Sequence, residues 1–224
     1  MASKRRPLRR WLRWAGLSLA AAAAWVALSL LALKFIDPPT TGVQMQRRVE
    51  SWFAKGKYVK RQQFVPLSRI SPVFQHAVIA AEDGNFYRHH GFDWEQIQDA
   101  IEDAEAGHPR GASTISQQLI KNLFFTTHGN PVRKAAEFAI VPVAELVLGK
   151  KRILELYLNV IEWGPGVFGA EAAAQAHYST TAARINREQG ARLAAVVPAP
   201  RRRKPARMDR YSAIILGRMT VLGW

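Results

Sequence analysis

The chain has 224 residues, a formal charge of +15 and no cysteine. This length accommodates one domain of ordinary size with a short appendage, and the missing cysteines exclude a disulfide framework, a thiolate metal site and a cysteine nucleophile. The charge predicts an anionic partner or surface, such as nucleic acid, phospholipid head groups or a phosphorylated substrate, without choosing among them.

The N-terminal segment predicts a membrane anchor. The first fourteen residues carry six basic groups and no acid, and the twenty residues from Trp14 to Leu33 carry no charge. Twenty helical residues span about 30 Å, roughly one hydrocarbon core. The preceding cations predict a cytoplasmic N-terminus and an exported remainder. A cleaved signal peptide is the alternative, but its apolar region is only about 7–15 residues long.

We therefore expect a basic cytoplasmic tail at 1–13 and a retained transmembrane anchor at 14–36. Two prolines, Pro38 and Pro39, end the anchor helix. Residues 37–64 form a juxtamembrane segment of uncertain structure, whose aromatic and basic side chains suit the head-group region. No repeat and no second apolar span follow, so 65–224 is expected to be one compact domain.

The rest of the chain is patterned as helices. A helix begins at Ser71-Pro72, with Ser71 as its N-cap, and ends near Glu82; a capping box at 114–117 begins the next. Further helices are predicted at 131–148, 151–160, 171–176, about 186–195 and 209–222. Pro142 should kink or split the first of these. No segment alternates long enough to demand a strand, so the predicted class is mainly α.

The stretch AEDGNFYRHHGFD places Glu82 at a helix C-terminus. The helix dipole disfavours a carboxylate there, and burial adds to the effect, so its pKa should rise toward that of a general acid or base. The alternative is a solvated turn with two exposed acids, Glu82 and Asp83. His89 and His90 lack the i+4 partner of a zinc motif, which favours structural or surface histidines over metal ligands.

A second polar cluster surrounds the predicted helix start in GASTISQQLIKNLFF. Its members are Ser113, Thr114, Ser116, Gln117, Gln118, Lys121 and Asn122. Free N–H groups and the positive dipole end suit a polyanion or a sugar, and Lys121 lies one turn further on. The alternative is a polar, solvated face that only caps the helix.

A third stretch runs from Val132 to Tyr178. Arg133 and Glu137 are four residues apart, either as an ordinary ion pair of a few tenths of a kcal/mol or as a site in which Glu137 orients Arg133 or a substrate. The sequence GPGVFG lacks both a preceding strand and the spacing of a dinucleotide loop, so its glycines indicate tight turns.

Three motifs in this order, EDGNFYRHHGFD, GASTISQQLIKN, and RKAAE followed by KKRILELYLNVIEWGPGVFGAEAAAQAHY, resemble the family 51 peptidoglycan glycosyltransferases. The resemblance covers roughly Val65 to Pro200. It implies a lysozyme-like helical domain with a small membrane-associated jaw. With one anchor and no room for a transpeptidase domain, the chain is similar to the monofunctional biosynthetic form.

The resemblance implies that the enzyme polymerises lipid II into β-1,4-linked glycan with inversion and releases undecaprenyl diphosphate. It makes Glu82 the general base for the acceptor's GlcNAc 4-hydroxyl and Glu137 the second catalytic carboxylate, a candidate ligand for Mg²⁺ or Mn²⁺; no organic cofactor is implied. Lys121, with Arg133 or Lys134, should clamp the diphosphate. The implied substrate contacts further include Ser113, Gln117, Gln118 and Asn122.

One position departs from the family pattern. Many members carry an arginine where this chain has Gly129, and His128 or Arg133 is expected to compensate. The basic run Arg201–Arg207 is expected on a surface near anionic lipid and the diphosphate. Nucleic acid is not expected as a partner, because an exported domain meets none.

The resemblance also implies partners and a location. The expected partners are lipid II, the growing glycan, membrane lipids, penicillin-binding transpeptidases and division proteins. The expected location is the bacterial inner membrane, with a single pass and the catalytic domain on the periplasmic face. A lytic transglycosylase or lysozyme is the rival enzyme, but it needs no cationic clamp. An inactive scaffold is favoured only by Gly129.

Overall fold

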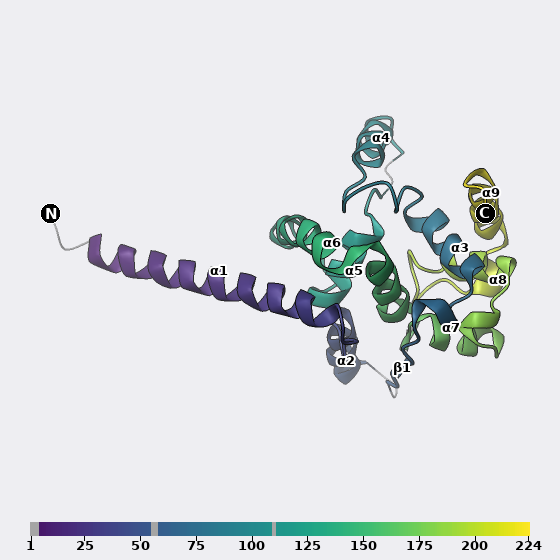
Figure 1. Ribbon diagram of the computed structural model, residues 1–224, viewed down its shortest axis with the longest axis horizontal. Coiled ribbons are helices and arrows are strands. Elements are labelled where there is room, and N and C mark those ends of the chain that lie inside the picture. The colour runs from purple at the N-terminus through teal and green to yellow at the C-terminus, as the bar shows by residue number, and fades with distance from the viewer. Residues whose placement is uncertain (1–4, 55–57, 109–110) are drawn as a thin grey trace.

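The computed structural model describes residues 5–54, 58–108 and 111–224 (Figure 1). The first four residues of the predicted 1–13 tail, residues 55–57 of the juxtamembrane segment and residues 109–110 lie outside the described residues. One long helix projects from a body built mainly of helices, and the C-terminus lies at the far end of that body (Figure 1).

The projecting helix is α1, Arg5–Leu33, and its segment Arg10–Leu33 is long and apolar enough to cross a membrane. Its C-terminal end is fastened to helix α6, Pro131–Val160. Arg152 of α6 donates from Nε to the Leu33 carbonyl oxygen at 2.8 Å, and its Nη2 lies 2.9 Å from Asp37 Oδ1. Two polar contacts and the buried Leu30 thus fix where the candidate anchor leaves the body.

Helix α2, Gly42–Phe53, occupies the segment whose structure the sequence left uncertain. Thr41 caps it, because its Oγ1 accepts a hydrogen bond from Gln44 N at 3.3 Å. Its N-terminal part packs on α5, Ile115–Phe124. Its exposed apolar side chains are Met45, Val49, Trp52 and Phe53. Their spacing of three to four residues puts them along one side of the helix.

The core lies between two groups of packed helices. Helix α5 packs along α6, while α3, Pro72–Glu82, packs against α8, Arg187–Ala194, and α9, Asp209–Val221. Large side chains such as Phe74, Tyr157 and Trp163 are fully buried there. The predicted capping box of α5 is confirmed, and α8 also begins with a capping box, formed by Asn186 and Gln189. Ser71 takes the predicted N-cap position of α3, but its side chain makes no capping hydrogen bond.

The break in α6 is not where proline predicted it. The helix continues through Pro142, and its non-helical residue is Gly149, with φ 71°. Pro142 is exposed, so water can satisfy the carbonyl group that its missing N–H leaves free. Gly149 adopts a positive φ at no steric cost and separates the two predicted helices, 131–148 and 151–160.

Short strands add a feature that the sequence did not indicate. Strands β1, Arg61–Gln62, β2, Glu162–Gly164, and β3, Val167–Phe168, form a sheet of order β1-β3-β2. β1 runs parallel to β3 with Arg61 opposite Val167, and β2 runs antiparallel to it. Two or three residues are too few to show a period of two, so the mainly helical class still holds.

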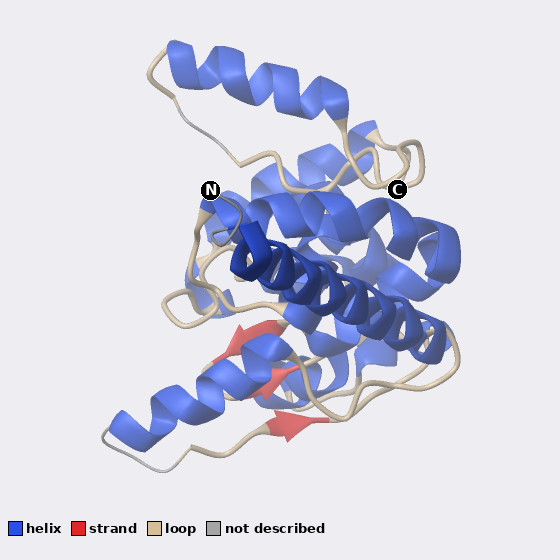
Figure 2. Cartoon of the chain, turned by 90° about the vertical axis from the view of Figure 1, so that its left-hand side faces the viewer, coloured by secondary structure: helices blue, strands red, loops and turns tan. Residues whose placement is uncertain are grey.

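The remaining elements are short. They are α4, Trp94–Glu105; α7, Ala170–Tyr178; and the 3₁₀ turns η1, Leu67–Arg69, η2, Ala182–Arg184, and η3, Pro205–Arg207. Helix α4 was not predicted; Asp93 caps it, and none of its residues is buried. Figure 2 shows α4 at one end of the molecule and α2 at the other, with the sheet beside α2.

Candidate active site

Glu82 is the last residue of α3, and two other helices hold its carboxylate. Gln118 of α5 donates from Nε2 to Glu82 Oε2 at 2.7 Å. The hydroxyl of Tyr157, on α6, donates in turn to Gln118 Oε1 at 2.8 Å. Because Tyr157 occupies the amide oxygen, the amide nitrogen of Gln118 must face Glu82. Glu82 is therefore an oriented carboxylate and not one of two free acids in a solvated turn.

Burial sets the electrostatics of this carboxylate. It raises the pKa of Glu82, while the Gln118 hydrogen bond and the charges of Lys121 and Arg203 act in the opposite direction. Burial also lowers the pKa of Lys121, against the attraction of Glu137 and Glu82. Burial raises the pKa of Tyr157 well above its usual value, so its hydroxyl remains a donor at neutral pH. The site thus combines a carboxylate that binds protons more readily with a lysine that releases its proton more readily.

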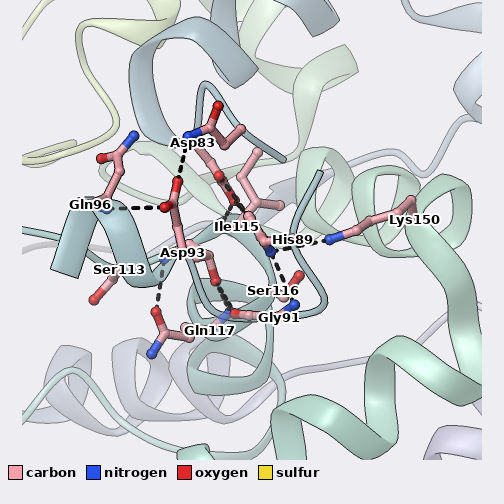
Figure 3. A network of polar contacts seen from close by, with 12 residues as sticks. Asp83, His89, Gly91, Asp93, Gln96, Ser113, Ile115, Ser116, Gln117 and Lys150 are labelled. Atoms are coloured by element: carbon pink, nitrogen blue, oxygen red, sulfur yellow. Dashed lines mark hydrogen bonds and ion pairs between the residues drawn. The ribbon is translucent and has the colours of Figure 1, made fainter. Parts of the chain in front are cut away.

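The buried carboxylate of Asp83 has a structural role and contacts His89 and Ile115 (Figure 3). Its carboxylate accepts from the backbone N–H of Ile115 at 2.9 Å and lies 2.9 Å from His89 Nε2. The Gly91 N–H donates to His89 Nδ1 at 3.0 Å, which leaves the ring proton on Nε2, facing Asp83. Asp83 and His89 together tie the end of α3 to the start of α5, as expected for a structural histidine, whereas His90 is exposed.

Lys150 closes the same network from α6 (Figure 3). Its Nζ lies 2.7 Å from Glu145 Oε1 and 3.4 Å from His89 Nδ1, and it sits 4.6 Å from the centre of the Phe86 ring. Ser116 Oγ donates to the same Glu145 oxygen at 2.5 Å. The loop after Glu82 is thereby fixed to α5 and α6.

The polar residues before and along α5 are either buried or line a cavity. Gln117 is buried and is used in the capping box, where its Oε1 accepts from Thr114 N at 2.9 Å, so the structure does not bring it to a cavity wall. Ser113 and Gln118 line the same cavity as Glu82. Lys121 and Asn122 line a neighbouring cavity, and Asn122 Nδ2 also donates to the Gln118 carbonyl oxygen at 2.8 Å.

The first turns of α6 supply the remaining charges. Asn130 caps the helix through Arg133 N at 2.7 Å. Glu137 is only 2 % exposed; Arg133 Nη1 lies 2.8 Å from its Oε1, and Lys134 Nζ lies 3.5 Å from its Oε2. The Arg133 contact is not aligned as a hydrogen bond, so Glu137 Oε1 and Arg133 Nε are buried without a hydrogen-bond partner among the described residues. This pair has unused polar capacity, unlike an ordinary surface ion pair.

The departure at Gly129 has a structural counterpart. A Cβ atom at position 129 would lie 3.8 Å from Arg133 Nη2, so the guanidinium of Arg133 lies beside this glycine. Arg133 is thus the better placed of the two expected substitutes for the missing arginine. Its position supports the expected compensation without testing it.

The residues around Glu137 do not fit a metal ion held by the protein alone. No group of three or more His, Cys, Asp or Glu side chains within the described ranges could hold one. Glu137 is also already flanked by two cations.

Two adjacent cavities lie at Glu82 and Lys121, whereas the predicted residues Arg133, Lys134 and Glu137 are not among those that line them. One of about 780 Å³ is lined by Glu82, Ser113 and Gln118 together with Tyr211 and Arg218 of α9. The other, of about 280 Å³, is lined by Lys121, Asn122 and Arg47. Both are bordered by Gln118 and Pro198, so the carboxylate and the lysine serve one continuous cleft.

A helical body with a glutamate and a group of cations along one cleft defines an enzyme of glycosyl transfer. The chain belongs to the transglycosylase family, whose profile matches residues 48–220, and its domain is lysozyme-like. The matched range is wider than the 65–200 of the motif resemblance.

Its relatives include proteins named biosynthetic peptidoglycan transglycosylase. Those of Ectopseudomonas mendocina (strain ymp) and Nitrosospira multiformis are 45% and 44% identical to this chain, covering 88% and 87% of it and 84% and 87% of the relatives. That of Dechloromonas aromatica is 46% identical over 87% of both chains.

Some residues that shape the site were missed by sequence reasoning. Tyr157 lies in an apolar helix stripe and is indistinguishable from a core residue until Gln118 is seen beside it. Arg47 lies in a segment without a predicted structure, yet its Nε is 2.8 Å from Glu162 Oε2 at the cleft. Arg203 is part of a basic run, which predicted only that this segment lies near anionic groups. No local pattern singled out these three residues.

Proposed function

We propose that this transglycosylase polymerises lipid II into linear β-1,4-linked glycan strands of peptidoglycan. The observation that carries the proposal is the oriented carboxylate of Glu82, within electrostatic reach of Lys121 in one cleft. The relatives' names supply the polymer, since they are biosynthetic peptidoglycan transglycosylases.

Glu82 acts as the general base. It takes the proton of the acceptor's GlcNAc 4-hydroxyl, and the hydroxyl oxygen attacks the anomeric carbon of the donor's MurNAc. The bond from that carbon to the diphosphate breaks as the new glycosidic bond forms, so the configuration inverts and undecaprenyl diphosphate leaves. A raised carboxyl pKa suits this role, because a stronger base removes a hydroxyl proton more readily.

The cations stabilise the leaving group. The charges of Arg133 and Lys134 act on Lys121 and lower its pKa, and Glu137 forms ion pairs with both. Fixed positive charges in a partly desolvated cleft stabilise the negative charge that develops on the diphosphate. Glu137 holds Arg133 in place through the ion pair at its Oε1, an atom that is buried and makes no hydrogen bond within the described residues. Ser113, Gln118 and Asn122 line the cleft as substrate contacts; the buried Gln117 supports them as a cap.

The surroundings of the cleft are membrane and cell wall. Under this proposal α1 crosses the bacterial inner membrane once, with the basic N-terminus in the cytoplasm and the catalytic domain on the periplasmic face. The exposed apolar side chains of α2 then lie at the membrane surface, as part of the membrane-associated jaw. Penicillin-binding transpeptidases and division proteins are the proposed partners, and a requirement for Mg²⁺ or Mn²⁺ stays a prediction.

The test is polymerisation of labelled lipid II by the detergent-solubilised full chain. We expect long strands that lysozyme digests, and at least about a 100-fold loss of rate for Glu82→Gln, which removes the base but keeps the shape. Glu95→Gln, at an exposed position on α4, is the matched control and should polymerise normally. Undiminished synthesis by Glu82→Gln would remove this residue from the role of base. Cleavage of finished glycan without synthesis would favour a lytic enzyme.

A further inference from the structure

A cationic cavity lies on the side of the body formed by α7 and α8. It has a volume of about 540 Å³ and is lined by Arg192, Arg201, Arg203 and Lys204, with no carboxylate among its lining residues. Like charges gathered at one hollow repel one another unless an anion occupies it. The cavity therefore has the character of an anion site.

Much of this positive charge is not neutralised by the protein. Within the described residues Lys204 has no carboxylate within 4.0 Å, and Arg203 Nη1 donates only to a backbone oxygen, that of Ala195, at 2.8 Å. The hydroxyl of Tyr178, which also lines the cavity, is buried and has no hydrogen-bond partner in the described part of the chain. Arg192 and Arg201 do have carboxylate partners, Asp209 and Glu50. Within the described ranges Arg203 and Lys204 thus lack a carboxylate partner, although the Arg203 guanidinium lies 5.2 Å from the centre of the Tyr211 ring, and the Tyr178 hydroxyl lacks a hydrogen-bond partner.

A series of neighbouring cavities connects this site with Glu82. A cavity of about 590 Å³ shares Pro165 and Arg201 with the cationic cavity, and shares Arg47 and Glu162 with the one that contains Lys121. The Lys121 cavity in turn borders the cavity of Glu82. The charge of Arg203 acts on Glu82 as well. A chain of sugars that leaves the catalytic cleft along these cavities would pass the cationic one.

The position favours an anion on the substrate over a membrane lipid. Helices α7 and α8 lie at the end of the body opposite the projecting α1 (Figure 1). Head groups around a membrane-spanning α1 lie at the other end, and on the side of α2 the charge of Arg201 is paired with Glu50. Under the proposed function, the anionic groups carried away from the diphosphate are the carboxylates of the stem peptides attached to the glycan.

We propose that the cavity formed by Arg201, Arg203, Lys204 and Tyr178 binds the stem-peptide carboxylates of the glycan held in the cleft. This inference rests on the proposed function and adds a recognition site to it. Binding is by charge and hydrogen bonds alone, with no covalent step. It lets the enzyme hold a strand by its peptides while the sugars move through the cleft.

The test compares Arg201→Gln/Lys204→Gln with the wild-type full chain. Arg203 is retained because it acts on Glu82, and Arg192 because it joins α8 to Asp209. The matched control is Arg69→Gln/Arg184→Gln, which removes two exposed charges that line none of the four cavities. Each protein receives lipid II with free peptide carboxylates or with those carboxylates amidated. Both substrates keep the diphosphate.

We expect wild type and control to use the carboxylate substrate about 3- to 10-fold better in kcat/KM, as two partly exposed charge contacts would give. This preference should disappear in Arg201→Gln/Lys204→Gln, with equal rates for all three proteins on the amidated substrate. Thermal unfolding of each protein verifies that it is folded.

Four outcomes contradict the site. Wild type that does not distinguish the substrates, or a variant that keeps the preference, overturns the recognition of carboxylates. A variant that loses the same factor on both substrates shows that the two cations act on the diphosphate. Failure of all three proteins to polymerise either substrate instead contradicts the proposed function, and the site with it.

Discussion

At the scale of single residues, the cleft works through side chains that hold other side chains. Gln118 carries no charge, yet it determines how Glu82 is presented, and it is itself oriented by Tyr157. Burial raises the pKa of Glu82 and lowers that of Lys121, so both pKa values move toward neutral pH. These opposite shifts have one cause, since desolvation disfavours either charge.

The pH dependence of polymerisation follows from these shifts. As the proposed general base, Glu82 acts when ionised, so activity should be lost as pH falls through a value above the ordinary 4.5. As a proposed contact of the diphosphate, Lys121 acts when protonated, so activity should also fall with rising pH, beginning below the ordinary 10.5. A profile of kcat/KM against pH checks both limbs. Lys121→Arg keeps the charge but does not titrate, so an alkaline limb that persists in this variant would exclude Lys121 as its source.

Tyr157→Phe tests the orientation of Gln118. Without the hydroxyl the amide can rotate, and Glu82 loses a fixed donor that lowers its pKa. We expect roughly a 3- to 10-fold lower kcat, about the worth of one hydrogen bond, and an acidic limb moved to higher pH. Tyr87→Phe, at an exposed ring outside the cleft, should change neither. A lower kcat with an unmoved acidic limb would indicate a purely structural role for Tyr157.

At the scale of elements, the loop from Asp83 to Asp93 fixes the positions of three helices relative to one another. It joins the end of α3, the start of α5 and the middle of α6 through Asp83, His89 and Lys150. Gly91 is the tightest point. Its carbonyl oxygen accepts from Thr114 Oγ1 at 2.7 Å, and its φ of 104° belongs to a region that residues with side chains rarely adopt.

Gly91→Ala should therefore destabilise the fold. An added Cβ would lie 2.5 Å from Val141 Cγ1, in a backbone conformation that is already unfavourable. Strain and overpacking together cost about 2–4 kcal/mol. At about 2–4 °C per kcal/mol the unfolding midpoint of the detergent-solubilised chain should fall by roughly 5–15 °C. Gly217→Ala on α9, where no atom lies within 4 Å, is the control. Equal unfolding midpoints for the two variants would show that the loop accommodates the added methyl group without losing stability.

At the scale of the whole molecule, the anchor and the catalytic body are joined firmly. Arg152 binds the end of α1 and Asp37, so the helix leaves the body in a defined direction (Figure 1). The cleft then lies at a set distance from the membrane that α1 is proposed to cross. Such an arrangement suits a substrate whose lipid stays in the bilayer while its sugars react.

The absence of cysteine makes the topology directly testable. Ser68→Cys introduces a thiol at an exposed position of the body, and Ser3→Cys introduces one in the basic tail. In cells whose outer membrane has been permeabilised, a maleimide that cannot cross the inner membrane should label the first and not the second. Labelling of position 3 alone would reverse the proposed orientation. Loss of the position 3 thiol from the mature protein would indicate a cleaved signal peptide.

Local patterns in the sequence predicted most of the helices and the residues of the cleft. A capping box, a proline at a helix start and a charge pair at i,i+4 involve neighbours, so they identified the start of α5, the start of α3 at Pro72 and the Arg133–Glu137 pair. The motif resemblance added the chemistry. The helix does not split at Pro142, one of the two predicted outcomes, and Ser71 takes the predicted N-cap position without a capping hydrogen bond; exposure and local geometry, which the sequence does not show, decide both.

Only the tertiary structure decided how these groups work together. Tyr157 reaches Gln118 across 39 residues, and Arg47 reaches Glu162 across 115. The charge of Arg203 reaches Glu82 from the basic segment after α8. Strands of two or three residues exist because β1 meets β3 in the fold. Such contacts depend on how distant segments pack, and no local sequence period predicts which segments pair. The resulting burial then determines which ionisable groups have a shifted pKa.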